Sequence, residues 1–260
     1  MKKLTLVNVE NLKHWENFFR EYFKIDYEVN DNPLLIFNDS DTLIEKNHTV
    51  PNFIPSLNIC KLFNDKYKTN DWLVANKFET IGYKVFQNSF ITDTKIITKP
   101  PNSTGRYGFR VWEKGSEVCA QEGDLIQDFI EGTEYNLDIL KDKNGDIYVC
   151  PKEKLLIKAG STFQCKLNID EELIHIGKQL ASKIDYIGSI DVDIMYCMWD
   201  STYYIIDINP RLGGGFLHSC NLDLAFEENI ISILNGGVLR YKSNARHDFI
   251  STIEYNFKLN

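Results

Sequence analysis

Two neighbouring strand-like segments of the chain carry acidic and amide side chains at alternating positions. These side chains belong to Asp191, Asp193, Asp207 and Asn209. Since side chains alternate between the two faces of a strand, the residues of each segment share a face. If the chain folds back near Asp200, Asp193 lies opposite Asp207. The same fold places Asp191 opposite Asn209, and directly opposite residues have Cβ atoms about 4.5–5.5 Å apart. The pattern therefore predicts a β-hairpin with four oxygen-bearing side chains on one face.

This face has the character of a site for a metal ion and a phosphate group. Facing carboxylates repel one another unless a cation or a shared proton lies between them, and a ligand set made only of oxygen favours Mg²⁺ or Mn²⁺. Arg211, two residues after Asn209, can bind a phosphate or a carboxylate with its planar guanidinium group. The glycines at 213–215 let the backbone approach a ligand closely or turn the chain. An ordinary solvent-facing strand pair is the alternative for each position taken alone.

The rest of the chain alternates short strands with a few helices. Strands are expected at 4–9, 34–37, 83–86, 90–92, 95–98, 125–130, 135–140, 188–198 and 203–209. Helices are expected at 11–23, 65–78, 171–184 and 222–234. Runs of strands with a few helices on one side predict an α+β fold with antiparallel sheets rather than a doubly wound parallel fold. Pro51 and Pro55 place a lobe boundary near residue 60.

Composition excludes several other classes of protein. The 260 residues are 43% hydrophobic and 25% charged, which excludes collagen-like, disordered and coiled-coil chains. The formal net charge of −8 argues against a general nucleic-acid binder, and no apolar stretch approaches the roughly 18 residues that cross a bilayer. The six cysteines are scattered without a C-x-x-C pair, which favours free thiols over disulfides. We therefore expect a cytoplasmic protein that binds neither nucleic acid nor a membrane.

The hairpin resembles the metal-binding end of the ATP-grasp superfamily, in which an acidic or amide residue precedes a Glu-x-Asn-x-Arg motif by some fourteen residues. Here fourteen positions separate Asp193 from Asp207, and Asp207-Ile-Asn209-Pro-Arg211 matches with Asp in place of Glu. The resemblance implies that Asp193, Asp207 and Asn209 bind Mg²⁺ or Mn²⁺. It also implies that Arg211 stabilises charge on the transferred phosphoryl group or its acceptor. The aspartate arm is one methylene shorter than the usual glutamate arm, which weakens the case for bidentate bridging of two metal ions.

Two upstream lysines resemble the phosphate-binding lysines of this superfamily. Lys66 stands in an Asn-Asp-Lys sequence that resembles the start of a helix, and Lys99 stands before a proline in a strand-like segment. The resemblance implies that both contact the phosphates of ATP, and that Lys99 acts in catalysis together with Arg211. Residues 103–108 resemble the mobile flap that covers the triphosphate and excludes water.

Residues 126–134 resemble the hinge that holds adenine in this superfamily. The residues expected at the base are Gln127, Asp128, Phe129 and Ile130. Glu134 is expected to accept hydrogen bonds from the ribose hydroxyl groups. Further on, relatives often place an arginine that faces the phosphates or the acceptor, and three lysines stand near that position. They are Lys152, Lys154 and Lys158.

The resemblance implies an ATP-grasp fold, in which two α+β lobes grip the nucleotide. Residues 61–127 would form the small lobe with the flap, and residues 128–260 the large lobe with the metal site. Residues 1–60 would form a reduced N-terminal α/β lobe. Because this part is short, we expect an acceptor site that is unusually open or is completed by a second copy or a partner subunit.

Within the superfamily, the chain resembles the carbamoyl-phosphate-synthetase-like and amino-acid-ligase-like branches. They imply transfer of the γ-phosphoryl group of ATP to a small carboxylate, followed by attack of an amine on the acyl phosphate. Phosphoryl transfer needs positioning and charge neutralisation more than a covalent nucleophile. Two alternatives stay open. One is phosphorylation of a small carboxylate such as carbamate without amide formation, and the other is a non-catalytic nucleotide-binding module.

Overall fold

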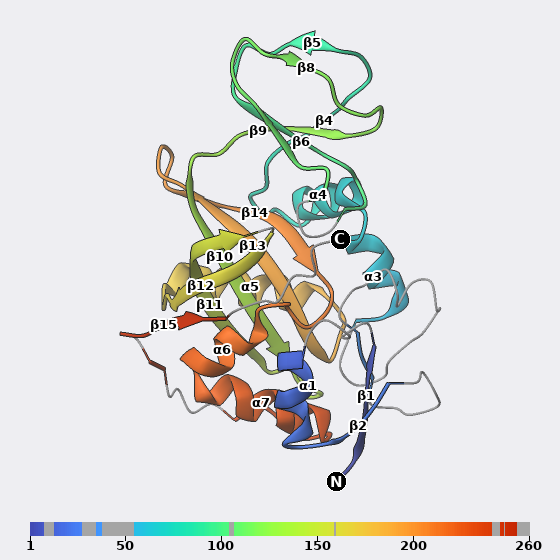
Figure 1. The fold of residues 1–260 in the computed structure, drawn as a ribbon, viewed down its shortest axis with the longest axis vertical. Helices are drawn as coiled ribbons and strands as arrows, with labels where there is room; N and C mark the ends of the chain where they lie inside the picture. The colour runs from blue at the N-terminus through green and yellow to red at the C-terminus, as the bar shows by residue number, and fades with distance from the viewer. Residues whose placement is uncertain are drawn as a thin grey trace.

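The computed structural model describes residues 1–7, 13–27, 35–37, 55–103, 107–158, 160–240, 245–246 and 248–253. The centre of the expected flap, residues 104–106, lies outside these ranges, as do the ends of three expected N-terminal elements. The described chain forms a large antiparallel sheet flanked by helices, a small β-rich lobe beyond one end of that sheet, and a short N-terminal sheet (Figure 1).

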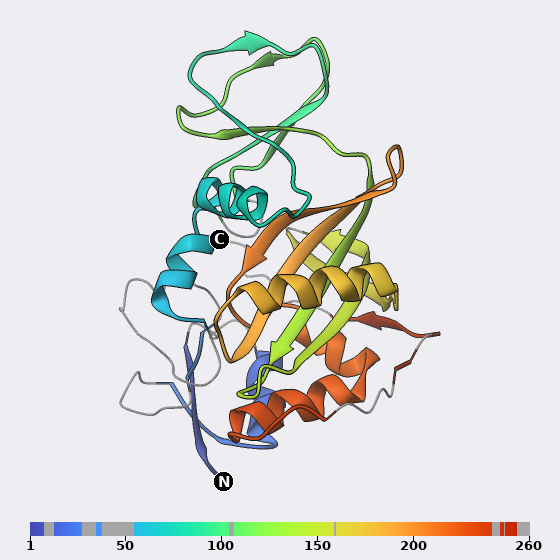
Figure 2. The ribbon, with the colours of Figure 1, turned by 180° about the vertical axis from the view of Figure 1, so that it is seen from behind.

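A six-stranded antiparallel sheet forms the centre of the larger lobe, in the order β14-β13-β10-β11-β12-β15. Its strands are β10 (Gly132–Lys141), β11 (Ile147–Lys158), β12 (Ser161–Leu167), β13 (Gly188–Cys197), β14 (Thr202–Asn209) and β15 (Ile250–Thr252). One face packs against α5 (Glu171–Lys183). The other face packs against α6 (Phe216–Leu222) and α7 (Leu224–Leu234) (Figure 2). The α+β class is confirmed, whereas the expectation of helices on one side is wrong because both faces of this sheet carry apolar residues.

Alternation along β10 shows how the two faces differ. Tyr135, Leu137 and Ile139 belong to the apolar core beneath α5. The intervening positions face the other way, and there Asn136 and Asp138 are buried although they are polar. Buried polar groups need partners, so this second face is where a functional network is expected.

The N-terminal segments share a core with α6 and α7. Here β1 (Lys3–Val7) pairs in parallel with β2 (Lys24–Asp26) and β3 (Leu35–Phe37), in the order β2-β1-β3. Trp15 and Phe19 of α1 (Lys13–Arg20) contact Phe216 of α6, with ring centroids 5.0 and 5.7 Å apart. This parallel sheet and its helix lie within the segment predicted to form the N-terminal α/β lobe.

The small lobe begins with two helices, α3 (Leu57–Phe63) and α4 (Lys66–Ala75). Asp65 caps α4 by accepting a hydrogen bond from Tyr67 N at 3.0 Å. A four-stranded antiparallel sheet in the order β4-β9-β6-β7 and a two-stranded sheet, β5-β8, follow. Their bounds are β4 (Lys84–Val85), β5 (Phe90–Ile91), β6 (Ile96–Lys99), β7 (Arg110–Trp112), β8 (Glu117–Val118) and β9 (Leu125–Asp128). The division of the chain near residues 60 and 127 stays a proposal, and α3 and β9 run across these positions.

The structure also bears on the cysteines, on membrane-spanning helices and on elements that the sequence patterns did not predict. All six cysteines are free thiols, and all but the exposed Cys119 are buried. Within the described residues, no helix combines the length and the apolar character needed to cross a membrane. The sequence patterns missed α6, which follows the glycine run, and the long strands β11 and β12.

Candidate active site

Strand pairing brings the predicted hairpin residues together. β13 and β14 are antiparallel neighbours, with Asp193 opposite Asp207 and Asp191 opposite Asn209. This is the pairing that the alternation predicted. The roles of these residues as metal ligands stay a prediction.

A β-bulge sets the register of this hairpin. Its tip is tighter than a turn centred on Asp200 would be, since Cys197 pairs with Thr202. Nearer the acidic residues the register shifts by one, which leaves Ile206 of β14 as an extra residue. The carbonyl oxygen of Ile206 accepts a hydrogen bond from Lys99 Nζ at 3.5 Å. The bulge therefore restores the predicted pairs and also offers a backbone acceptor to the small lobe.

The polar face extends from the hairpin across β10 to β11. One row of opposite residues consists of Asp207, Asp193, Asn136 and Lys152. The next row consists of Asn209, Asp191, Asp138 and Cys150. Asn136 and Asp138 were not predicted as site residues, although residues 134–139 show the same alternation of polar and apolar side chains as the hairpin. That alternation was the available signal.

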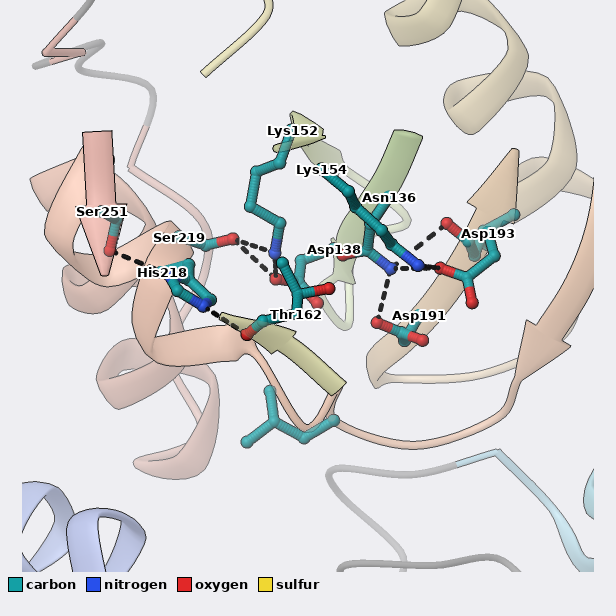
Figure 3. A network of polar contacts seen from close by, with 12 residues as sticks. Asn136, Asp138, Lys152, Lys154, Thr162, Asp191, Asp193, His218, Ser219 and Ser251 are labelled. Carbon is teal, nitrogen blue, oxygen red and sulfur yellow. Dashed lines mark hydrogen bonds and ion pairs between the residues drawn. The ribbon is translucent and has the colours of Figure 1, made fainter. Parts of the chain in front are cut away.

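Asp191 holds two amide groups in fixed orientations. Asn136 Nδ2 donates to Asp191 Oδ2 and to Asp193 Oδ1, both at 2.9 Å (Figure 3). Asn209 Nδ2 donates to Asp191 Oδ1 at 3.0 Å. Burial, together with the nearby charges of Asp193 and Asp138, raises the pKa of Asp191 to about 7. Because the NH₂ group of Asn209 faces Asp191, its carbonyl oxygen is the atom left for a cation.

Lys154 lies between two carboxylates of the polar face, those of Glu134 and Asp193. Its Nζ is 2.7 Å from Glu134 Oε1 and 2.7 Å from Asp193 Oδ1. Burial alone would lower the pKa of Lys154, but the charges of Asp193 and Glu134 outweigh it and raise that pKa. Burial would raise the pKa of Asp193, but Lys154 outweighs it and lowers that pKa. Glu134, the residue expected at the ribose, is thus also an ion-pair partner of Lys154.

The other two candidate lysines have different surroundings. Lys158 Nζ lies over the ring of Phe163, 4.8 Å from its centroid. Lys152 is buried, forms an ion pair with Asp138, and donates to Ser219 Oγ of α6 at 2.7 Å. Ser219 Oγ in turn donates to Asp138 Oδ2 at 2.6 Å. Lys154 is therefore the lysine of the three that faces the hairpin carboxylates, and Lys152 ties the sheet to α6 (Figure 3).

The glycine run after the hairpin packs against two buried carboxylates, those of Asp138 and Asp191. Asp138 Oδ1 is buried and has no hydrogen-bond partner within the described structure. A Cβ atom at Gly213 would lie 2.5 Å from Asp138 Oδ1 and 2.3 Å from Asp191 Oδ2. Gly213 therefore lets the backbone approach two carboxylates closely. At Gly214 a Cβ atom would meet nothing within 4 Å.

His218 of α6 lies beside this network and has its own two partners, Ser251 and Thr162 (Figure 3). Its Nε2 is 3.0 Å from Thr162 O and its Nδ1 is 2.8 Å from Ser251 Oγ. Burial lowers the pKa of His218 to about 4, and Lys152 also opposes a positive charge there. The neutral imidazole thus joins α6 to β12 and β15.

The small lobe contributes the two expected phosphate lysines. Lys66, in the first turn of α4, lies 3.7 Å from Asp207 Oδ1 and donates to Ser103 O at 2.6 Å. Lys99, at the end of β6, is half-buried, and its partial removal from water lowers its pKa to about 8 although Asp207 opposes this shift. Both amino groups thus converge on the Asp207 segment of β14. Arg211, just after β14, donates from Nη1 to Leu212 O at 3.0 Å.

The segment expected to hold adenine connects β9 to β10. Gln127 donates from Nε2 to a small-lobe carbonyl at 2.7 Å, and its Oε1 is buried without a partner among the described residues. Phe129 N donates to Lys95 O at 3.1 Å, and Lys95 Nζ lies 4.4 Å from the centroid of the Phe129 ring. Asp128 is exposed and Ile130 is half-buried. Their contacts to a nucleotide stay predictions.

The residues of the hairpin fit a magnesium ion that is shared with phosphates. Within the described chain, no three His, Cys, Asp or Glu side chains are grouped as metal ligands. The predicted set instead combines two carboxylates with one amide, and Mg²⁺ is usually bound through one or two carboxylates, several waters and substrate phosphates. The carbonyl oxygen of Asn209 and the side chain of Asp207, which is 26% exposed, are available for this role.

A family comparison identifies the fold. The family described as the ATP-grasp domain matches residues 63–215, which is more than half of the chain. The chain belongs to the ATP-grasp superfamily. The matched range contains Lys66 and Lys99, the segment predicted to hold adenine, and the acidic hairpin. No curated protein matches the chain.

Solved ATP-grasp structures superpose over nearly all of the chain. An ATP-grasp superfamily protein from Archaeoglobus fulgidus gives a TM-score of 0.64 at 16% identity, covering 92% of this chain and 90% of that one. The biotin carboxylase domain of Hydrogenobacter thermophilus 2-oxoglutarate carboxylase gives 0.70 at 14% identity, covering 96% and 73%. N5-carboxyaminoimidazole synthetase from Staphylococcus aureus, complexed with ADP, gives 0.71 at 12% identity, covering 94% and 80%. At these identities the similarity shows the fold.

Proposed function

We propose that this protein is an ATP- and Mg²⁺-dependent ligase that activates a carboxylate as an acyl phosphate for attack by an amine. The observation that carries the proposal is the pairing of Asp193 with Asp207 beside Lys66 and Lys99. Two lobes thereby contribute opposite charges to one place, as binding of a metal–triphosphate requires. The superfamily membership of the chain supports the same reaction class.

The proposed reaction has two displacement steps. First, a carboxylate oxygen attacks the γ-phosphorus of ATP, and ADP leaves with the electron pair of the broken P–O bond. Second, the amine nitrogen attacks the carbonyl carbon, phosphate leaves with the electrons of the C–O bond, and the nitrogen loses a proton. Lys66 and Lys99 would hold phosphate oxygens, and Arg211, whose buried Nε has no partner in the described part of the chain, would hold the transferred group or its acceptor. Mg²⁺ would neutralise charge on the β- and γ-phosphates.

Bicarbonate is a second candidate for the activated carboxylate. The structurally similar biotin carboxylase domain from Hydrogenobacter thermophilus was solved with MgADP, ADP and bicarbonate. Its fold covers 96% of this chain. This second reaction would phosphorylate a small carboxylate, with or without a following amine.

An ADP-release assay tests the proposal. Mg·ATP is offered with pools of carboxylates and amines, and separately with bicarbonate. ADP release that depends on a carboxylate and an amine supports the ligase, whereas release with bicarbonate alone supports the second candidate. Asp207→Asn is expected to lower the rate about 100-fold, the scale on which losing one charge-stabilising group acts. The control Asp185→Asn removes an exposed carboxylate outside the site and should leave the rate unchanged.

Binding of ATP without ADP release from any pool would contradict both reactions and favour a non-catalytic nucleotide-binding module. Absence of ATP binding would contradict the nucleotide site itself. An unchanged rate in Asp207→Asn at saturating Mg²⁺ would contradict the metal assignment.

A further inference from the structure

Glu134 and Asp193 already have a cation between them, the ammonium group of Lys154. Lys154 Nζ is 2.7 Å from Glu134 Oε1 and 2.7 Å from Asp193 Oδ1. The three side chains are only 8%, 13% and 22% exposed, respectively, so that little water competes for these contacts. Two carboxylates that would otherwise repel one another are thus joined by one ammonium group.

One oxygen of Asp193 is fully used in this arrangement. Asp193 Oδ1 accepts from Lys154 Nζ at 2.7 Å and from Asn136 Nδ2 at 2.9 Å. A carboxylate oxygen has about two lone-pair sites, so that Oδ1 has none left for a metal ion while both donors stay. Asp193 therefore has only Oδ2 to offer, and Glu134 Oε1 is engaged by the same lysine.

The other half of the hairpin has a different environment. Asp207 meets Lys66 at 3.7 Å, which is beyond hydrogen-bond distance, and its side chain is 26% exposed. Asn209 donates its NH₂ group to Asp191, which leaves its carbonyl oxygen for a cation. Asp207 and Asn209 lie two residues apart on β14 and share a face. Apart from Asp193 Oδ2, the open oxygen atoms of the hairpin thus lie on β14, and the ammonium group of Lys154 lies toward β10 and β11.

We propose that the ammonium group of Lys154 takes the place of one metal ion, so that the protein binds ATP with a single divalent cation held by Asp207 and Asn209. This inference rests on the proposed ATP site. A second divalent cation at Asp193 would have to displace an ammonium group that two carboxylates hold, or share one carboxylate oxygen beside it. The aspartate at position 207, with its shorter arm, is consistent with a carboxylate that serves one metal ion rather than bridging two.

Counting Mn²⁺ ions tests the inference without measuring turnover. The full-length protein is saturated with a non-hydrolysable ATP analogue, and bound Mn²⁺ per bound nucleotide is counted by electron paramagnetic resonance in a Mn²⁺ titration. The wild type should bind one Mn²⁺ per nucleotide. Lys154→Met removes the charge but keeps most of the chain length, and should bind two. Lys154→Arg keeps the charge and should bind one. The matched control Lys158→Met removes a lysine of the same strand that lies over Phe163, and should also bind one.

The Mn²⁺ count separates failure of the single-cation inference from failure of the proposed ATP site. Two Mn²⁺ ions per nucleotide in the wild type would overturn the inference and leave the ATP site intact, and this count needs no variant to fold. A single Mn²⁺ in a folded, nucleotide-bound Lys154→Met protein would overturn it as well. Absence of nucleotide binding in the wild type would overturn both the inference and the proposed function.

Discussion

The buried ion pair between Lys152 and Asp138 allows a quantitative test of the network that supports the site. The Lys152 side chain is 3% exposed and the Asp138 side chain is 0% exposed. Lys152→Met would remove the positive charge and keep most of the volume. Asp138 would then be left with the hydroxyl group of Ser219 as its remaining donor, since its Oδ1 has no partner among the described residues.

The expected cost is large because a charge is left buried without its partner. Breaking a buried ion pair by removing one member costs about 3–5 kcal/mol of unfolding free energy. The double variant Lys152→Met/Asp138→Asn leaves no buried charge in the pair. Its cost should fall short of the sum of the two single costs by at least about 1.5 kcal/mol, because coupled residues are non-additive on this scale.

Denaturant unfolding of the wild type, both single variants and the double variant measures these values. The control is Lys166→Met, which breaks the Lys166–Glu153 ion pair on the neighbouring strands at 3.0 Å. There the lysine is 44% exposed, and such a pair contributes about 0–1 kcal/mol. The reasoning is refuted if Lys152→Met costs no more than this control, or if the two single costs simply add.

Three further predictions follow from other residues of the network. Because the pKa of His218 is lowered to about 4, His218 takes up a proton below pH 6.5 in the unfolded chain but not in the folded chain, so that the contribution of His218 to stability should fall by about 3 kcal/mol between pH 6.5 and 4. In urea unfolding, the difference in unfolding free energy between the wild type and His218→Gln should change by this amount over the same pH range, whereas the difference between the wild type and the exposed His175→Gln should stay constant. Gly213→Ala should cost about 1–3 kcal/mol in the same measurement, because its Cβ atom would press on two carboxylates, whereas Gly214→Ala should cost little. Lys99→Met should weaken binding of an ATP analogue at least tenfold in calorimetry, and unchanged affinity would exclude Lys99 from the phosphate site.

The hairpin could be predicted because alternation is a strong signal wherever one face of a strand pair is polar. The pairing of Asp193 with Asp207 follows from that alternation. The turn assumed at Asp200 was slightly misplaced, and the bulge at Ile206 compensated for it. A bulge adds one residue without changing the polarity pattern, so that the sequence could not have shown it.

Other parts of the site could not be derived from pattern alone. Lys152, Lys154 and Lys158 all stand at even-numbered positions of one strand, and period-two alternation treats them as equivalent. The register of β11 and β12 shifts twice between Lys154 and Ile157, which separates Lys158 from the other two. The short helix α6 follows directly on a glycine run, which reads as a loop, and it is held by packing rather than by propensity.

The candidate site lies at the edge of the sheet, where the carboxylates of the polar face no longer have a neighbouring strand on both sides. Across the polar face the strands provide counterparts: Lys152 for Asp138, Lys154 for Asp193, and amide groups for Asp191. β14 is the edge strand of this sheet. Asp207 therefore has a neighbour on one side and faces the small lobe on the other.

On that side Lys66 Nζ lies 3.7 Å from Asp207 Oδ1, and Lys99 Nζ lies 3.5 Å from the carbonyl oxygen of Ile206. Neither distance is that of a tight ion pair, so that the carboxylate of Asp207 stays available for a ligand. Asp138 and Asp193, deeper in the sheet, are instead paired with lysines. Asp207→Asn should therefore change metal binding strongly and stability little. The same substitution at Asp138 should do the reverse, because Asp138 is the acid that the sheet and α6 enclose.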